Sequence, residues 1–244
     1  MAARQTSPKI HNLLLNALPD ADRALVGRSL EAVDLPLRLQ LEQRNRLAAH
    51  VYFPESGIAS VVVRGPRGQD IEGGIIGRDG MTGLATVLGA DRSAHDIMIQ
   101  LAGEGQRMPV AAFAAALRES RAFDLACRRY VYAFLVQTSY TALANGRNNI
   151  EERLARWLLM AQDRTDTQEL DFTHEFLALM LGVRRAGVTL AISLLTGAGL
   201  ILHARGRIAI IDRPGLVAIT KGSYGPAEEH LERLSPKKPL LTAA

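Results

Sequence analysis

The sequence predicts an α+β chain in which a β-rich N-terminal domain precedes a long helix and a small C-terminal domain. Three observations predict this. Eleven of the 21 glycines lie between residues 50 and 109, where they separate short β-branched runs. No glycine or proline occurs between Pro109 and Gly146, which favours continuous helix. A further apolar helical stretch starts at Arg184, stops at Gly197-Ala-Gly199, and is followed by two short β-type runs.

The composition is typical of a soluble globular protein. The chain has 244 residues, 48% hydrophobic and 22% charged, so it can bury a sizeable core. Its net charge of +4 is too small to indicate a partner by itself. Cys127 is the single cysteine, which excludes internal disulfides and argues against iron–sulfur clusters or cysteine-ligated zinc. The first residues lack the apolar core of a signal peptide, so we expect a cytoplasmic protein.

The N-terminal half predicts two short helices and then an antiparallel sheet domain. Residues 10–31 have helical apolar spacing interrupted by Pro19 and Asp20. The runs HVYF, GIASVVV, DIEGGII and HDIMIQL then have strand composition and are separated by glycine turns. Brief strands at this spacing indicate a sandwich or barrel.

A long helix is predicted from about residue 121 to 145, after a shorter one that ends near Arg118. The segment YVYAFLV within it is apolar almost all round, so it needs packing partners on two sides. We expect one partner to be the β domain and the other to be the same helix of a second subunit. The alternative is a central helix of a monomeric protein. The expected subunit contacts are Val131, Phe134, Leu135 and Thr138.

Residues 173–196 have the spacing of a helix-turn-helix. Thr173 is a suitable N-cap, Ala178 is small enough for a helix crossing, Gly182 can take positive φ in the turn, and Val188 can face the first helix. The LILHARGRIAIID segment that follows predicts a β-hairpin with a basic tip, which makes the unit a winged helix. A membrane span is not expected, because it needs about 20 apolar residues and only about 13 helical ones follow Arg184.

Basic residues concentrate in the same segment. From residue 176 to 221 there are six basic residues against Asp212 alone, which is the footprint expected of a DNA-contacting face. The alternative is a solvated arginine pair on an ordinary helix. The candidate DNA-binding residues are Arg184, Arg185, Thr189, Thr173, Arg205 and Arg207.

This order of elements resembles the Crp/Fnr superfamily of bacterial transcription regulators over nearly the whole chain. The segments HVYFPESGIASVV, IGRDGMTGLATVLG and THEFLALMLGVRRAGVT carry the resemblance. It implies a double-stranded β-helix (jelly-roll) domain resembling cyclic-nucleotide-binding domains, a dimerisation helix and a winged helix-turn-helix. It also implies a homodimer that binds a two-fold-symmetric DNA operator and contacts RNA polymerase, with no membrane partner. The expected boundaries are 1–118, 119–147, 148–225 and a C-terminal tail at 226–244.

The chain departs from the superfamily pattern at two places. Where well-known members carry serine, arginine, glutamate and a later arginine on the recognition helix, this chain has Arg184, Arg185, Ala186 and Leu190. The operator is therefore expected to differ from the familiar one. The same alignment makes Arg185 the best candidate for reading bases, and it implies that the arginines of the hairpin contact the DNA backbone.

The second departure concerns the effector. Arg92 and Ser93 match the phosphate-binding cassette and could hold an anion, although Arg92 could equally lie in a surface turn. Met81 stands where cyclic-nucleotide binders carry a carboxylate for the ribose, and a thioether is at most a weak acceptor. We therefore expect weak or absent cyclic-nucleotide binding, no cofactor and no metal.

An enzyme is the alternative class of function. A β-barrel that binds a small ligand or metal could be catalytic, with the winged helix serving protein or RNA contacts. The barrel region offers only His50 and His95 as histidines, and no nucleophile motif occurs. We therefore expect a protein without enzymatic activity.

Overall fold

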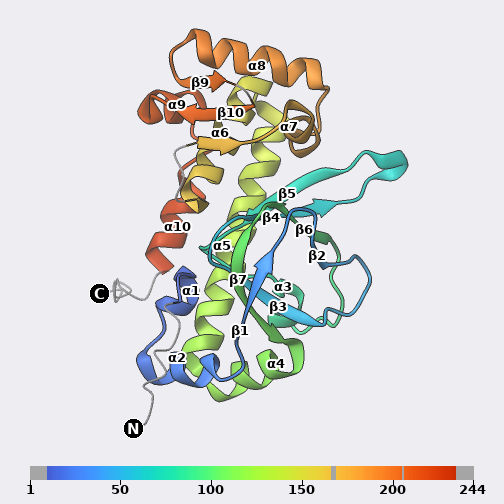
Figure 1. Ribbon diagram of the computed structural model, residues 1–244, viewed down its shortest axis with the longest axis vertical. Coiled ribbons are helices and arrows are strands. Elements are labelled where there is room, and N and C mark those ends of the chain that lie inside the picture. The colour runs from blue at the N-terminus through green and yellow to red at the C-terminus, as the bar shows by residue number, and fades with distance from the viewer. Residues whose placement is uncertain (1–9, 166–168, 205, 235–244) are drawn as a thin grey trace.

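The computed structural model describes residues 10–165, 169–204 and 206–234. Figure 1 shows a β domain and a helical C-terminal domain, with the long helix α5 running beside both. The helices are α1 (Leu13–Asn16), α2 (Asp20–Gly27), α3 (Leu84–Val87), α4 (Val110–Glu119), α5 (Arg121–Arg147), α6 (Ile150–Arg164), α7 (His174–Leu181), α8 (Arg185–Gly197), α9 (Arg213–Ile219) and α10 (Pro226–Leu234). The strands are β1 (Glu31–Leu35), β2 (Gln40–Glu42), β3 (His50–Pro54), β4 (Ile58–Val63), β5 (Ile71–Ile76), β6 (Asp96–Leu101), β7 (Gly103–Pro109), β8 (Glu169–Asp171), β9 (Ile201–Ala204) and β10 (Arg207–Ile210).

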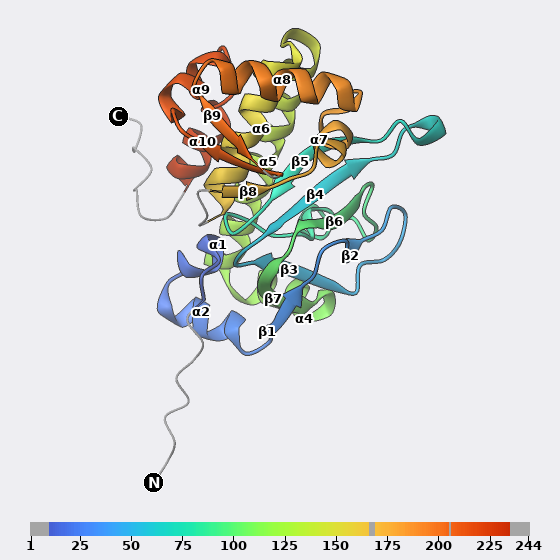
Figure 2. The ribbon, with the colours of Figure 1, turned by 45° about the horizontal axis from the view of Figure 1, so that its top comes forward.

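The N-terminal domain is an antiparallel β-sandwich, as the sequence predicts. One sheet has the order β1-β7-β3 and the other has the order β2-β6-β4-β5 (Figure 2). Alternate residues of the strands point inward and form one apolar core between the sheets. The strand contribution to this core is Leu35, Leu41, Val51, Phe53, Ala59, Val61, Ile76, Ile97, Ile99 and Met108.

Helices α4 and α5 close the sandwich on one side. Phe113 of α4 and Phe123 of α5 are fully buried against Phe53 of the sheet, and the Phe113 and Phe123 rings meet edge to face at 5.5 Å between centroids. Ser120 separates the two helices, since its hydroxyl caps α5 by accepting from the backbone N–H of Phe123. The long helix has 27 residues and spans about 40 Å.

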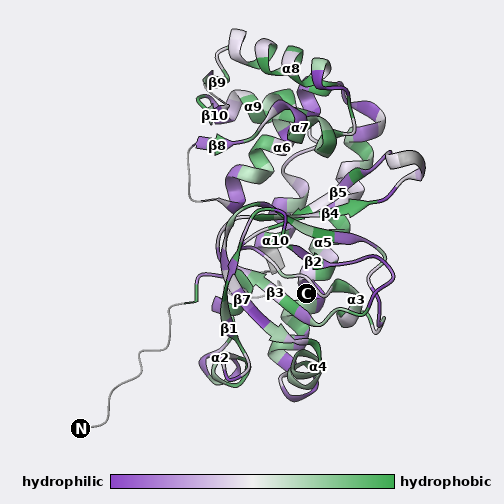
Figure 3. Ribbon diagram, turned by 45° about the vertical axis from the view of Figure 1, so that its right-hand side comes forward, coloured by the Kyte–Doolittle hydropathy of each residue, from purple (hydrophilic) through white to green (hydrophobic). Residues whose placement is uncertain are grey.

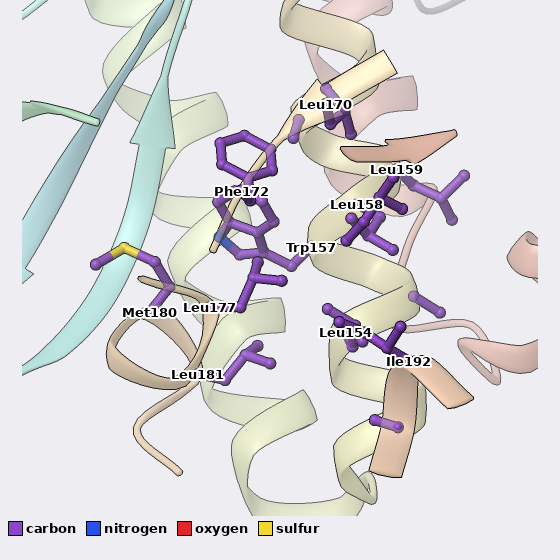
Figure 4. Close-up of a cluster of buried hydrophobic side chains, with 14 of the residues drawn as sticks. Leu154, Trp157, Leu158, Leu159, Leu170, Phe172, Leu177, Met180, Leu181 and Ile192 are labelled. Carbon is purple, nitrogen blue, oxygen red and sulfur yellow. The ribbon is translucent and has the colours of Figure 1, made fainter. Parts of the chain in front are cut away.

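The C-terminal domain is built around α6. This helix begins with a capping box between Asn149 and Glu152, and most of its length is buried because helices lie on several sides of it. Figure 4 shows the apolar cluster that α6 forms with β8, α7 and α8. The cluster also contains Ile58 and Ile75, which belong to the β domain, so the core of the C-terminal domain extends onto the sandwich.

The segment after residue 225 differs from the expected tail. Residues 226–234 form α10, which turns back and packs along α5 (Figure 1). Ala227 and Leu231 supply its apolar contacts, and the ring of His230 lies 4.8 Å from that of Tyr132. Composition alone indicated a polar tail because the apolar partners of α10 lie about 90 residues earlier in the chain. Residues 235–244 lie outside the described part of the chain.

Candidate nucleic-acid interface

Helices α7 and α8 form a helix-turn-helix with the geometry that the sequence predicts. The axes of the two helices turn by 105° at the break between them, within the usual range for this motif. Gly182 ends α7 with φ of 61°, and the backbone N–H of Val183 donates to the carbonyl of Ala178. Thr173 caps the start of α7 by accepting from the backbone N–H of Phe176.

The two faces of α8 differ sharply. Its inner face is buried through Val188, Ala191, Ile192 and Leu195, which pack into the apolar cluster of the domain. Its outer face carries charged residues only near its start, and Figure 3 shows mostly pale or hydrophobic colour further along. The exposed residues on this face are Arg184, Arg185, Ala186, Thr189, Leu190, Ser193 and Leu194.

Arg184 and Arg185 present the strongest exposed positive charge of the helix-turn-helix. Within the described residues neither side chain forms a salt bridge. Arg184 is the N-cap residue of α8, and Arg185 is its first helical residue. Both guanidinium groups are therefore free to meet an anionic partner in front of α8.

Three side chains connect the first helix, the second helix and the hairpin. The Nδ1 atom of His174 lies 2.9 Å from the hydroxyl of Thr189, and its Nε2 atom lies 3.4 Å from Nε2 of His203 on β9. Partial burial, with the nearby positive charges of His203 and Arg185, lowers the pKa of His174 below its usual value. No sequence signal indicated this contact, because 29 residues separate the two histidines.

The hairpin forms as predicted, but the charge of Arg207 is compensated. Strands β8, β10 and β9 make a three-stranded antiparallel sheet. Arg207 donates to the Glu169 carboxylate at 2.9 Å and lies 3.6 Å from Asp171, both on β8. Hydrogen bonding to Glu169 is the main reason that the pKa of Arg207 is raised. Arg205 lies outside the described residues.

Two further basic residues of the counted segment are also paired. Arg213 contacts Asp163 at 2.6 Å, and Lys221 pairs with Glu152. The charge excess counted over residues 176–221 therefore overestimated the unpaired positive charge that the surface presents. The acids that compensate it precede residue 176 in sequence, and the fold brings them to the basic residues.

Arg92 and Ser93, which are expected to hold an effector anion, bond backbone carbonyls of the chain itself. Arg92 is about half exposed and donates to the carbonyl of Asn45 at 2.9 Å, while the Ser93 hydroxyl donates to the carbonyl of His95. Met81 is fully buried in the sandwich core. Arg92 therefore lies at the surface and Met81 in the core of the sandwich.

On the side that faces α5, the loop before Met81 is covered by the Tyr130 side chain. A Cβ atom built on Gly80 would lie 1.9 Å from the Tyr130 ring, so this ring of α5 packs directly on the loop before Met81. Asp79 of the same loop forms a buried salt bridge of 2.7 Å with Arg164.

The expected subunit contacts on α5 lie on one side of the helix but differ in burial. Phe134 is only 8% exposed, and it packs inside the protomer near Gly74 of β5. Val131 and Thr138 lie beside it and are partly exposed, whereas Leu135 is 58% exposed. The periodicity of apolar residues could not separate buried from exposed positions here, because the whole YVYAFLV segment is apolar.

Within the described residues, no single helix is long and apolar enough to cross a membrane. Helices α7 and α8 pass that test only when they are taken together, across their 105° bend. In the same part of the chain, no group of three or more His, Cys, Asp or Glu side chains is placed to hold a metal ion.

Comparison with known proteins places these features in a family context. Residues 152–219 match the family described as the Crp-like helix-turn-helix domain. A Crp/Fnr-family transcriptional regulator from Eubacterium rectale has a similar structure, with a TM-score of 0.65 and 18% sequence identity over 86% of this chain and 98% of that one. A CRP-family transcriptional regulator from Thermus thermophilus gives a TM-score of 0.62 and 19% identity over 78% and 97% of the two chains. The c-di-GMP-responsive global regulator CLP of Xanthomonas campestris gives a TM-score of 0.62 and 15% sequence identity, over 79% of this chain and 99% of that one. No curated protein sequence matches the chain.

Proposed function

The chain has the fold of Crp/Fnr transcription regulators and carries a Crp-like helix-turn-helix domain, and from this premise we propose that it binds duplex DNA sequence-specifically through α8. The observation that carries the proposal is the outer face of α8. There, Arg184 and Arg185 stand exposed and without acidic partners among the described residues, at the start of a helix whose opposite face is fully buried. An exposed helix of this kind fits the major groove, with its N-terminal residues nearest the bases.

The residues of this face define what kind of sequence it reads. Arg185 can bond guanine O6 and N7 in a bidentate manner. Ala186 and Leu190 follow on the exposed face with no polar group to offer, and Leu190 is 60% exposed. Apolar side chains in the major groove contact the methyl group of thymine. The preferred half-site therefore combines a guanine opposite Arg185 with thymine near Leu190.

Thr173 and Thr189 have supporting positions. Thr173 sits at the N-terminus of α7, where backbone N–H groups and a hydroxyl favour a phosphate. The hydroxyl of Thr189 is already engaged with His174, so its role is to fix the register of α8 against the DNA backbone. Arg207 contributes less than a free arginine, because a phosphate must compete with Glu169.

A homodimer is the second part of the proposal. Four large apolar side chains of α5 are exposed, and at 100° per residue they fall within about 80° of arc, on the side away from the sandwich. These residues are Leu125, Tyr132, Leu135 and Leu143. Pairing of this stripe with its copy would bury it and give a two-fold axis along α5. The operator would then consist of two inverted half-sites, and RNA polymerase would be the partner met at a promoter.

The β domain is the part proposed to receive a signal. The Tyr130 ring occupies the space beside the Gly80 loop, and Arg92 is exposed. Both observations argue against a cyclic nucleotide held as in the superfamily's nucleotide binders. Any small effector of this domain would therefore bind elsewhere or in another way.

Selection of binding sites from random duplex DNA tests the proposal. The expected product is an enriched sequence with two inverted half-sites whose centres are about one helical turn apart. Affinity for it should exceed that for unselected duplex by at least about 10³-fold, and it should fall as salt rises. Binding without any sequence preference, or no binding by a folded dimer, would contradict the proposal.

A further inference from the structure

A buried carboxyl lies where the β domain meets the C-terminal domain. Glu72 of β5 is only 6% exposed. Its Oε1 atom accepts a hydrogen bond of 2.7 Å from the indole Nε1–H of Trp157 on α6, and its Oε2 atom accepts from the Ser60 hydroxyl on β4. One carboxyl group is therefore bonded to both domains at once.

The surroundings of Glu72 belong to the contact between the domains. Met180 of α7 places its sulfur 3.5 Å from the Ser60 hydroxyl, and α7 lies against β5. Figure 4 shows Trp157 among the apolar side chains of α6, α7 and β8, with its indole nitrogen on the side of Met180 and the β-strands. A Cβ atom at Gly182 would lie 3.1 Å from Ile71, so the turn of the helix-turn-helix also contacts β5 closely.

This arrangement can hold Glu72 in its protonated form without losing a hydrogen bond. The acid O–H can donate to the Ser60 oxygen, and the Ser60 hydroxyl can turn its proton toward the Met180 sulfur. Oε1 still accepts from Trp157. Burial raises the pKa of Glu72 from its ordinary value to about 7, although the hydrogen bonds from Ser60 and Trp157 oppose the rise.

The charged groups near Glu72 all come from α6. Arg156 and Arg164 lower the pKa of Glu72 through their charge, but neither forms a salt bridge with it. Arg156 donates to the carbonyls of Ser223 and Gln137, and Arg164 pairs with Asp79. Arg153 lines the same small pocket and donates to the carbonyl of Leu181. The other groups bonded to Glu72 or next to it, on β4 and α7, are uncharged.

We propose that Glu72 is a proton-binding site that couples the docking of the helix-turn-helix domain on the β domain to pH. In the docked arrangement Glu72 is buried between Ser60 and Trp157, and when the domains separate its carboxyl group becomes hydrated and ionises. Docking is therefore accompanied by uptake of a proton at this carboxyl group.

The sign and size of the effect follow from linkage. Because the pKa is about 7 when Glu72 is docked and 4.5 when it is hydrated, the proton's contribution to docking is fully present below pH 4.5 and is lost as pH rises through 7. The equilibrium constant for separation of the domains should rise about 30-fold between pH 5.5 and 8.5.

The single tryptophan of the chain makes this measurable, because Trp157 itself contacts Glu72. Tryptophan fluorescence of the full chain is titrated from pH 5 to 9, and its quenching by acrylamide is measured at each pH. We expect one transition, in which quenching becomes stronger as pH rises and levels off above about pH 7, where Glu72 is ionised in both arrangements. Glu72→Gln keeps a neutral group of the same shape, so both changes should disappear and quenching should stay low.

Two further variants keep the test decisive. Ser60→Ala removes a hydrogen bond that lowers the pKa of Glu72, so it should move the midpoint to higher pH. Glu42→Gln alters another buried carboxylate, which accepts from the backbone N–H of Gly83 at 2.6 Å, and it should leave the midpoint unchanged. The proposal is overturned if quenching of the wild-type chain does not depend on pH, if the transition persists in Glu72→Gln, or if Ser60→Ala does not shift it.

Discussion

Replacement of Arg185 by alanine is the most direct test of how α8 reads DNA. The side chain is exposed, forms no salt bridge within the described residues, and occupies the first helical position of α8. Alanine is a good helix former, so the folded state should change by less than about 0.5 kcal/mol. A change in DNA binding can then be attributed to the lost base contact and not to unfolding.

The expected size of the effect follows from the contact. A bidentate arginine–guanine pair discriminates against the wrong base by about 1–3 kcal/mol, and a dimer loses one such pair in each half-site. The total of about 2–6 kcal/mol corresponds to a loss of roughly 30-fold to 10⁴-fold in affinity for the selected sequence. Affinity for unselected duplex should fall much less, because that binding depends on phosphates.

Fluorescence anisotropy with labelled selected and unselected duplexes, at several salt concentrations, measures both affinities. Arg207→Ala is the matched control, since it removes the same charge from the hairpin of the same domain. This variant should lower the affinity for both duplexes by a similar and small factor, because Glu169 already compensates the charge of Arg207. If Arg185→Ala left the ratio of the two affinities intact, the proposed register of α8 would be wrong.

Four further outcomes are expected. Leu135→Glu should convert the dimer to a folded monomer in light scattering, whereas Phe134→Glu should unfold the chain because Phe134 is buried; a dimer that survives Leu135→Glu would refute the proposed stripe. Substituting uracil for thymine in the selected sequence should weaken wild-type binding but not that of Leu190→Ala, and equal losses would exclude methyl reading. Gly80→Ala should lower the melting temperature by several degrees, since the new Cβ would overlap the Tyr130 ring; unchanged melting would show that the ring moves freely. Calorimetric titration with cyclic AMP and cyclic GMP should show no sub-micromolar binding, and such binding would overturn the argument from the filled site.

The helix-turn-helix could be predicted from sequence because its constraints are local. Ala178, Gly182 and Val188 are each fixed by a single requirement, and these requirements recur at constant spacing. The strands of the sandwich could be predicted equally well, since glycine turns and β-branched runs mark them in the sequence. The long helix needed only the absence of glycine and proline between residues 109 and 146.

The electrostatics of the site could not be predicted in the same way. Arg207, Arg213 and Lys221 looked like free positive charge because their acidic partners lie on β8 and α6. The contact between His174 and His203 likewise exists only once the hairpin folds over α7. Counting charges along a segment ignores pairs that the tertiary structure forms.

Burial was the other quantity that the sequence left open. Glu72 occurs in a strand pattern where a carboxylate would normally face water, and only the packing of α6 and α7 on β5 covers it. The burial of Phe134 within its own chain could not be read from the sequence, because its neighbours on both sides are apolar. In each case the deciding information is which element covers the residue.

The return of α10 to α5 means that the DNA-binding unit is anchored at both of its chain ends to one rigid rod. It leaves α5 through Asn148, whose side chain bonds the carbonyl of Thr220, and it comes back through Ala227 and Leu231. A displacement of α5 relative to the sandwich is therefore expected to move both ends of this unit together, and α8 with them.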